Sequence, residues 1–392
     1  MQMQAVPDLN MVKLSPDEQV SIETGYFVFT LMPSLYCKLR CPHCYLSLEQ
    51  RKDTTILSVD KVSEACAKID AYYQKKRLER KTIVNYWYGG EPTSMGEDYF
   101  RSCADAIGSH FTAEKGYDIH HTVLTSLVGV DLDVWGPIFE QYGKGAFQTS
   151  FDGLMRGKGY MRVWDNRVRE ANARGLEVST ISVVNEALLS DGPVAVLDYL
   201  SDLNVAETSW LPFMLNAQNE ATKKYDEFAP RMDVWSEFMI ALSSRWLERK
   251  RAGLHAPEIG QLRFILRQRE LGDFANIAGQ TLFLMPNGDF VLPDYGSDSG
   301  LEYMQRFGNI LEQDFEEVLR SPERRRYIRK QILRNGNPDC VDCSHSGYCV
   351  MEFWKKNRPG DDCFGGRNYV EWVLENEAEI RHFTGSGGVR LY

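Results

Sequence analysis

The chain has 392 residues, 43% of them apolar, and a formal net charge of −10. This length and apolar content allow two or three globular domains with a real core. The negative charge argues against sequence-independent binding to nucleic acid, whose phosphates require a basic surface. No stretch approaches the ~18 uninterrupted apolar residues of a membrane span. Residues 1–20 lack the basic and apolar regions of a signal peptide, so no membrane association is expected.

The nine cysteines are an odd number, which excludes complete internal disulfide pairing. Free or metal-bound thiols suit a reducing compartment, and we therefore predict a cytoplasmic location. Cys66 and Cys103 lie in helical stretches and are expected to be buried thiols. The other seven cysteines fall into two groups that are considered below.

From residue 26 onward, apolar strands alternate with amphipathic helices, after an N-terminal arm over 1–25. The predicted strands are 26–32, 83–88, 119–124, 146–151 and 177–184, and the predicted helices are 60–73 (with Ser58 as a possible N-cap), 97–110, 132–142 and 162–174. This alternation predicts an α/β fold of βα units around a parallel sheet, closed or partly closed as a barrel.

The rhythm changes after residue 213. Residues 230–285 are mostly helical in pattern, a hairpin is predicted over 282–291 around Asn287-Gly288, and the tail from 336 is loop-rich. The predicted domain limits are 1–25 for the arm, 26–225 for the barrel, 226–299 for a bridging helical and hairpin region, and 300–392 for a cysteine-containing domain.

The first cysteine group, Cys37, Cys41 and Cys44, follows the first predicted strand at C-x3-C-x2-C spacing. Three thiolates from one short loop can hold a [4Fe–4S] cluster and leave one iron open for an outside ligand. A zinc site that uses His43 as its fourth ligand and three buried free thiols are the alternative interpretations.

Polar residues and glycines follow the ends of the later strands. They are Gly89, Gly90, Glu91 and Pro92 after the second strand, Thr125 and Ser126 after the third, and Ser150 to Gly153 after the fourth. Barrels of this kind gather function at the carboxyl ends of their strands, so we expect these residues to meet one ligand. The glycines would let the main chain approach it, and the carboxylate is a natural partner for an ammonium group.

The second cysteine group is Cys340-x2-Cys343-x5-Cys349-x13-Cys363. Four cysteines in one loop-rich segment predict a closed metal site. Either zinc or an iron–sulfur cluster satisfies this pattern.

Together, these motifs resemble the radical S-adenosylmethionine (SAM) superfamily. Its cysteine pattern is C-x3-C-x-aromatic-C, with His43 here at the aromatic position, and Gly89 to Pro92 resemble its GGEP element. The resemblance implies a partial (β/α)6 TIM-like barrel and a [4Fe–4S] cluster that binds SAM. It also implies a 5′-deoxyadenosyl radical that abstracts hydrogen from an unactivated C–H, and a one-electron reductant such as flavodoxin or ferredoxin. Glu91 would meet the SAM ammonium group.

The segment from Ser150 to Gly153 resembles the S-x-D-G element of the family, which implies that Ser150 meets the SAM ribose and that Asp152 belongs to the cofactor site. Arg162 falls where related proteins place an arginine that pairs with the SAM carboxylate, and Arg167 is its rival for that role. Ser126 stands where relatives often have asparagine.

The second cysteine group resembles the SPASM extension, a loop-rich iron–sulfur domain. Phe353 replaces one family cysteine, and residues 285–295 contain none of the upstream cysteines. The resemblance therefore implies a reduced form with one auxiliary [4Fe–4S] cluster on the four remaining cysteines. Asp294 is a candidate general base or an ordinary turn residue, and Tyr295 is a candidate proton or hydrogen-atom donor.

Relatives of this type mostly modify peptides or protein side chains, so we predict cross-linking, epimerisation or oxidation of a peptide. The basic run from Arg320 to Arg334 is either a solvated helix face or a dock for an acidic peptide segment. The alternatives are a radical SAM dehydrogenase or epimerase of a small molecule such as a sugar, and a non-catalytic iron–sulfur or zinc binding protein.

Overall fold

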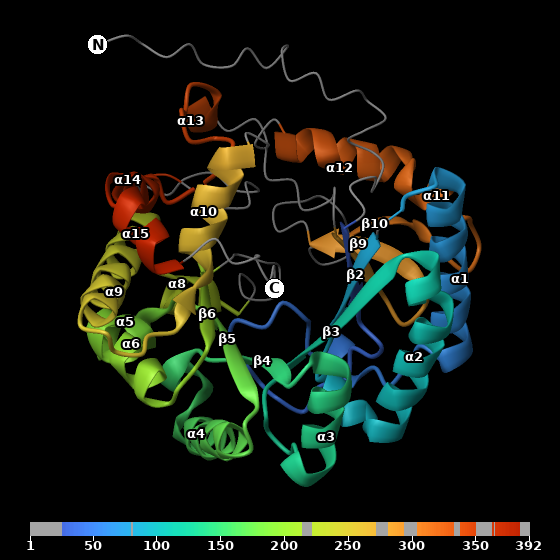
Figure 1. The fold of residues 1–392 in the computed structure, drawn as a ribbon, viewed down its shortest axis with the longest axis horizontal. Helices are drawn as coiled ribbons and strands as arrows, with labels where there is room; N and C mark the ends of the chain where they lie inside the picture. Colours follow the sequence, from blue (N-terminus) through green and yellow to red (C-terminus); the bar gives the residue numbers. More distant parts are fainter. Residues whose placement is uncertain are drawn as a thin grey trace.

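In this computed structural model, the described residues are 26–79, 81–213, 222–271, 281–293, 304–332, 338–349, 363 and 365–384. Within these ranges the strands form one ten-stranded sheet in the order β10-β9-β8-β1-β2-β3-β4-β5-β6-β7. Figure 1 shows the strands inside an arc of helices. The predicted arm 1–25, Asp294 and Tyr295 lie outside the described residues, and the predicted domain limits stay predictions.

The strands are β1 Tyr26–Leu31, β2 Lys81–Trp87, β3 Tyr117–Thr125, β4 Ala146–Ser150, β5 Glu177–Val183, β6 Glu207–Leu211, β7 Glu258–Ile259, β8 Thr281–Leu284, β9 Asp289–Pro293 and β10 Met304–Asn309. Consecutive strands from β1 to β7 pair in parallel. β8 adds in parallel beside β1, and β9 and β10 extend that edge as antiparallel strands. In the described part, β7 and β10 are the two ends of the sheet and are not paired with each other, so the barrel is partial.

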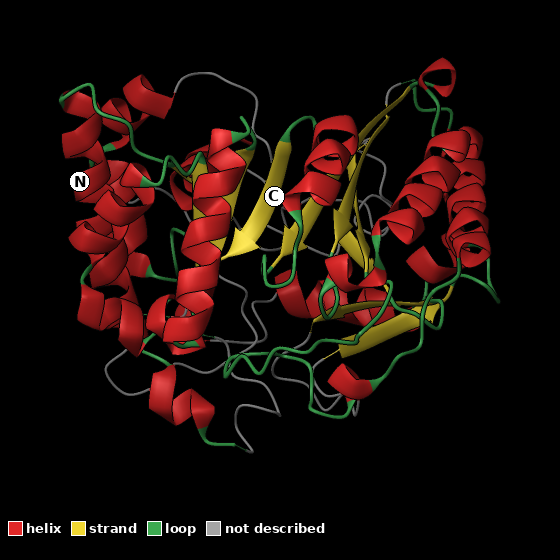
Figure 2. Cartoon of the chain, turned by 90° about the horizontal axis from the view of Figure 1, so that it is seen from below, coloured by secondary structure: helices red, strands yellow, loops and turns green. Residues whose placement is uncertain are grey.

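The helices are α1 Val59–Lys76, α2 Glu97–His110, α3 Leu132–Gly143, α4 Lys158–Ala173, α5 Glu186–Asp191, α6 Pro193–Asp202, α8 Lys224–Phe228, α9 Met232–Arg251, α10 Gly260–Leu271, α11 Phe315–Leu319, α12 Pro322–Ile332, α13 Pro338–Val341, α14 Arg367–Glu375 and α15 Glu377–Thr384, with short 3-10 helices η1 Gln50–Lys52, η2 Pro92–Met95, η3 Ala113–Lys115 and η4 Gly153–Arg156. Figure 2 shows the longer helices gathered on both sides of the strands. Across the described ranges, no helix combines the length and the apolar character needed to cross a membrane.

Several predicted elements match the structure closely. The predicted helix 97–110 coincides with α2, and Ser58 caps α1 by accepting a hydrogen bond from the Lys61 amide at 3.4 Å. The predicted hairpin is formed by β8 and β9. α4 begins four residues earlier than predicted, because Gly157, with φ +90°, opens the helix from its N-cap position. β6 was not predicted as a strand, since its sequence Glu-Thr-Ser-Trp-Leu has little apolar content.

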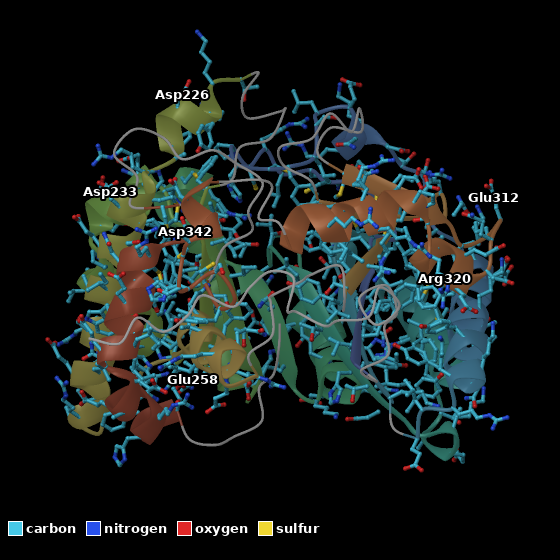
Figure 3. All side chains as sticks on the ribbon, turned by 90° about the horizontal axis from the view of Figure 1, so that it is seen from above. Asp226, Asp233, Glu258, Glu312, Arg320 and Asp342 are labelled. Atoms are coloured by element: carbon cyan, nitrogen blue, oxygen red, sulfur yellow. The ribbon has the colours of Figure 1, made fainter. Side chains whose placement is uncertain are left out.

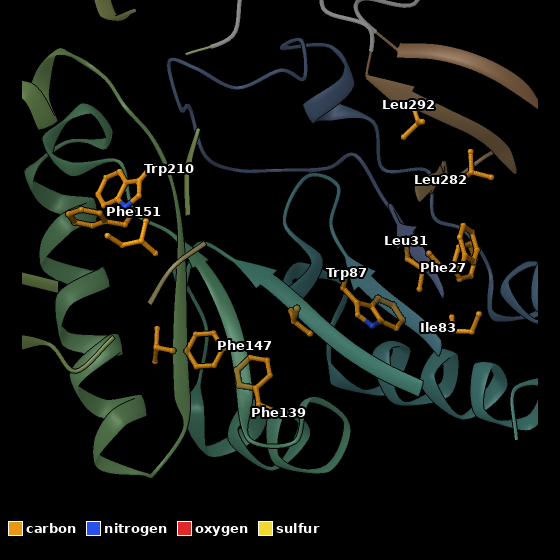
Figure 4. Packing of buried hydrophobic residues seen from close by; sticks show 14 of the residues in the cluster. Phe27, Leu31, Ile83, Trp87, Phe139, Phe147, Phe151, Trp210, Leu282 and Leu292 are labelled. Atoms are coloured by element: carbon orange, nitrogen blue, oxygen red, sulfur yellow. The ribbon is translucent and has the colours of Figure 1, made fainter. Parts of the chain in front are cut away.

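One large apolar core fills the space between the sheet and the helices. Figure 4 shows Phe27 and Leu31 of β1 and Trp87 of β2 on one side of it, and Phe147 of β4 and Trp210 of β6 on the other.

The two cysteines predicted to be buried thiols belong to this core. Cys66 lies on α1 and Cys103 on α2, and both are fully buried. The prediction for these two residues is confirmed.

A second apolar cluster fastens the cysteine loop, residues 33–58, to the hairpin edge of the sheet. Leu35 and Leu46 of the loop pack with Met32, with Val291 of β9 and with Met304 of β10, and Cys44 borders the cluster. The loop has little regular structure of its own, so these contacts between distant segments determine its position.

We expect Leu46→Ala to lower the free energy of unfolding by about 2–5 kcal/mol, because Leu46 is only 1% exposed and its removal leaves a cavity beneath the loop. Leu48→Ala is the matched control, since Leu48 lies on the same loop but is 42% exposed. Urea denaturation of both variants measures the difference. Equal effects would show that the cluster does not hold the loop.

Candidate functional site

A pocket open to solvent lies at the carboxyl ends of strands β1 to β6. Its lining residues are Cys37, Leu39, Cys41, His43, Cys44, Tyr45, Arg51, Tyr88, Gly89, Gly90, Glu91, Pro92, Leu124, Thr125, Ser126, Ser150, Asp152, Arg156, Ile181, Ser182, Val183, Leu211 and Pro212. All three cysteines of the first group are therefore present, with every predicted cofactor-binding residue except Arg162. Arg162 is exposed on α4, and Arg167 pairs with Glu170 at 2.5 Å.

The two glycines at the end of β2 are required by the cysteine loop. Gly89 has φ +108°, and a Cβ atom there would lie 2.5 Å from the carbonyl oxygen of Ser34. At Gly90, a Cβ would come within 3.0 Å of the carbonyl oxygens of Leu35 and Tyr36. The Gly90 amide instead donates to Ser34 O at 3.1 Å. The close main-chain approach expected from the sequence is thus an approach to the cysteine loop.

Glu91 is held by hydrogen bonds to both of its carboxylate oxygens. Oε1 accepts from the hydroxyls of Thr93 at 2.7 Å and Thr125 at 2.8 Å. Oε2 accepts from the Ser126 amide at 2.9 Å and the Ser126 hydroxyl at 2.5 Å. In this structure, Ser126 is therefore a partner of Glu91, and the end of β3 orients the carboxylate at the end of β2.

Arg156, which sequence reasoning missed, joins three of the predicted site residues. Its Nε donates to Asp152 Oδ2 at 2.5 Å, its Nη1 to Cys41 Sγ at 3.3 Å, and its Nη2 to His43 Nε2 at 3.2 Å. The i,i+4 spacing from Asp152 is the local signal that could have suggested the ion pair. The contact of Arg156 with the cysteine loop, more than a hundred residues upstream, could not be predicted from a single sequence.

Charges in this part of the pocket are buried. Burial raises the pKa of Asp152, but Arg156 and the Val183 amide lower it by more, so the pKa lies below its usual value and the carboxylate is ionised. Burial, with a further contribution from Arg156, lowers the pKa of His43 to about 4, which leaves the ring neutral. A guanidinium can only donate, so His43 Nε2 accepts and the hydrogen-bond network assigns the ring proton to Nδ1.

Two buried polar atoms of the pocket have no hydrogen-bond partner in the described part of the chain. They are His43 Nδ1 and the hydroxyl of Ser182 on β5. An unpaired buried polar group is costly, so these atoms are suited to partners on a bound ligand. On the opposite side, Tyr45 stacks on Tyr88 with ring centroids 5.5 Å apart and donates to Gly89 O at 3.2 Å.

The three cysteines suit an iron–sulfur cluster better than a single zinc ion. Zinc with thiolates at about 2.3 Å would bring the sulfurs to within ~4 Å of one another. Among the described residues, no three Cys, His, Asp or Glu side chains are grouped to hold one metal ion, whereas in a cluster each thiolate binds a different iron. Burial raises the pKa of the Cys44 thiol to about 11 and also raises those of Cys37 and Cys41, so metal binding must displace protons.

Two cysteines of the second group, Cys349 and Cys363, lie together beside the start of α14. A Cβ atom on Gly365 would lie 3.1 Å from Cys349 Sγ and 3.8 Å from Cys363 Sγ, and the Arg367 amide donates to Cys363 Sγ at 3.1 Å. The amide of Cys343 donates to Cys340 O at 3.3 Å. Residues 350–362 lie outside the described residues. In the described part of this segment, the Cys363 sulfur accepts from a backbone amide, and a closed metal site on all four cysteines stays a prediction.

We expect Gly90→Ala to destabilise the protein by about 1–3 kcal/mol, because its Cβ would force the cysteine loop away from β2. The loop should then retain less iron after anaerobic reconstitution. Gly108→Ala is the control, since Gly108 faces open space within α2 and alanine favours a helix by about 0.5–1 kcal/mol. Thermal unfolding and iron analysis of both variants measure the two effects. A Gly90→Ala protein with normal iron content would contradict the predicted displacement of the cysteine loop.

No family model matches the sequence of this chain. Its structure is similar to that of anSMEcpe, an anaerobic sulfatase maturase solved with bound AdoMet and the Cp18Cys peptide, with a TM-score of 0.68, 15% identity, and coverage of 91% of this chain and 98% of that one. It is also similar to SuiB of Streptococcus suis bound to precursor peptide SuiA, with a TM-score of 0.56, 14% identity, and coverage of 83% and 71%. These similarities confirm the predicted fold, an α/β fold with a partial barrel.

Proposed function

We propose that this chain is a radical SAM enzyme that modifies a peptide or protein side chain. The observation that carries the proposal is the pocket, where the C-x3-C-x2-C cysteines, the GGEP element and the S-x-D-G segment meet at one end of the sheet. In such a site, a [4Fe–4S] cluster with SAM supplies a 5′-deoxyadenosyl radical that abstracts a hydrogen atom.

Different residues of the pocket are proposed to bind different groups of SAM. Glu91, already oriented by Thr125 and Ser126, presents a fixed carboxylate to the ammonium group. Ser150 lines the same pocket and is our candidate for the ribose. The role of Arg162 at the SAM carboxylate stays a proposal, since its side chain is exposed on α4.

A peptide is the substrate class best supported. The two solved structures compared above, anSMEcpe and SuiB, were each solved with a bound peptide. The basic run offers a complementary surface, because Arg325, Arg326 and Arg329 are exposed on α12. Figure 3 shows Arg320 at the start of this run, where it forms an ion pair with Glu316 at 3.3 Å. An acidic segment of a peptide would fit the exposed arginines.

The four C-terminal cysteines are proposed to hold one auxiliary [4Fe–4S] cluster, and flavodoxin or ferredoxin is the proposed reductant. Full coordination by four thiolates would let that cluster carry electrons without binding substrate. Asp294 and Tyr295 remain the proposed groups for handling the substrate radical. A cytoplasmic location also remains a prediction.

We expect the anaerobically reconstituted protein to cleave SAM to 5′-deoxyadenosine when it receives one electron from dithionite. Chromatography of the reaction mixture measures the product. The Cys37→Ala, Cys41→Ala, Cys44→Ala triple variant serves as control and should form none. A well-folded wild-type protein with a full complement of iron that forms no 5′-deoxyadenosine would refute the proposed enzyme.

We expect wild-type protein to bind ~8 irons, corresponding to two four-iron clusters, and the triple cysteine variant to bind about half as many. Iron, sulfide and zinc analyses of both proteins test this. About four irons together with one zinc in the wild type would show that the C-terminal cysteines hold zinc.

A further inference from the structure

We propose that Arg156 is a positioning residue that donates a hydrogen bond to the Cys41 thiolate and thereby raises the reduction potential of the cluster on the cysteine loop. The inference rests on the proposed function, since it concerns the cluster that the loop would hold. It assigns a role to a residue that is absent from the sequence motifs.

The geometry fixes Arg156 in place. Its three guanidinium nitrogens have three different partners, Asp152, Cys41 and His43. Asp152 is itself anchored, because its Oδ1 accepts from the Val183 amide at 2.7 Å and its carbonyl accepts from Asn185 at 3.2 Å. The end of β5 therefore holds Asp152, and Asp152 holds Arg156 against the cysteine loop.

The surroundings strengthen the contact with sulfur. The Arg156 side chain is 8% exposed and that of Asp152 is 1% exposed, so water screens neither group. Arg51, the other arginine of the pocket, directs Nη1 to Leu39 O at 3.0 Å and Nε to Ser47 O at 3.4 Å, and therefore supports the loop main chain. Arg156 instead contacts a sulfur that would bind iron.

One-electron reduction makes a cluster and its thiolates more negative. A hydrogen bond to a thiolate therefore stabilises the reduced form more than the oxidised form and raises the potential. The electron comes from the external one-electron reductant, and no bond of this chain forms or breaks. Arg156 keeps its proton in both states, because a guanidinium does not deprotonate in proteins.

The test is a redox titration of the reconstituted full-length protein, performed without SAM. It is monitored by the electron paramagnetic resonance signal of the reduced cluster on the cysteine loop. Arg156→Gln removes the charge, and Arg156→Lys keeps it but loses the planar fork. We expect both to lower the potential of the catalytic cluster. The ratio of reduced to oxidised cluster at a fixed potential should fall about tenfold in Arg156→Gln, which corresponds to ~59 mV.

Arg169→Gln is the matched control, because it removes one positive charge from the exposed side of α4, where Arg169 pairs with Asp165 at 2.7 Å. It should leave the potential unchanged. Arg156→Lys also decides the outcome if Arg156→Gln fails to retain iron, because it keeps the positive charge.

Unchanged potentials in both Arg156 variants would overturn the inference. If Arg156 binds SAM instead of the sulfur, the SAM-free potential will stay constant while the Kd for SAM rises, which also overturns it. A wild-type protein with no reducible cluster would refute the proposed function itself. A normal wild-type signal with unchanged variants would refute only the role of Arg156.

Discussion

The site depends on the contact between the end of β2 and the main chain of the cysteine loop. There is no room for a side chain at Gly89 or Gly90. A Cβ atom on either glycine would lie within 3.0 Å of a carbonyl oxygen of the loop, from Ser34, Leu35 or Tyr36. The next residue, Glu91, donates its amide to Tyr36 O at 3.2 Å. The contact that places the loop therefore also places the carboxylate proposed to bind the SAM ammonium group. The proposed cluster site and the proposed SAM site thus share one junction.

The negative charges of the pocket are paired with groups of the protein itself. Both carboxylates are satisfied by the protein before any ligand arrives, the half-buried Glu91 through hydroxyls and an amide, and the buried Asp152 through Arg156 and the Val183 amide. An unpaired buried carboxylate would be costly and would tend to take up a proton. With both carboxylates paired, the buried atoms left without a partner include His43 Nδ1 and the Ser182 hydroxyl. A ligand that bonds to these neutral atoms does not have to break an ion pair.

The parallel sheet and the membership of the pocket were predictable from the sequence, because strand ends in a parallel barrel share one edge and Glu91, Ser126 and Ser150 each follow a strand. The roles of individual residues were less predictable. Ser126 orients Glu91, which depends on β3 lying beside β2. Arg156 reaches Cys41 across 115 residues of sequence, and its 3-10 helix, closed by Gly157, carries no apolar periodicity that would reveal it. Such roles arise from tertiary neighbours and leave no trace in local spacing.

A short loop without regular structure must still present three cysteines at defined positions, and each receives a different support. Beside Cys37, the Tyr36 carbonyl binds the end of β2, and the Cys37 amide donates to Arg51 O at 3.1 Å. Cys41 contacts Arg156, which follows β4. Cys44 borders the apolar cluster formed with β9 and β10. The supports are polar at Cys37 and Cys41 and apolar at Cys44, and they come from separate parts of the chain. The antiparallel strands β9 and β10 therefore help to hold the cysteine loop. The pairing of β8 with β1 brings this C-terminal part of the chain beside the N-terminal motif.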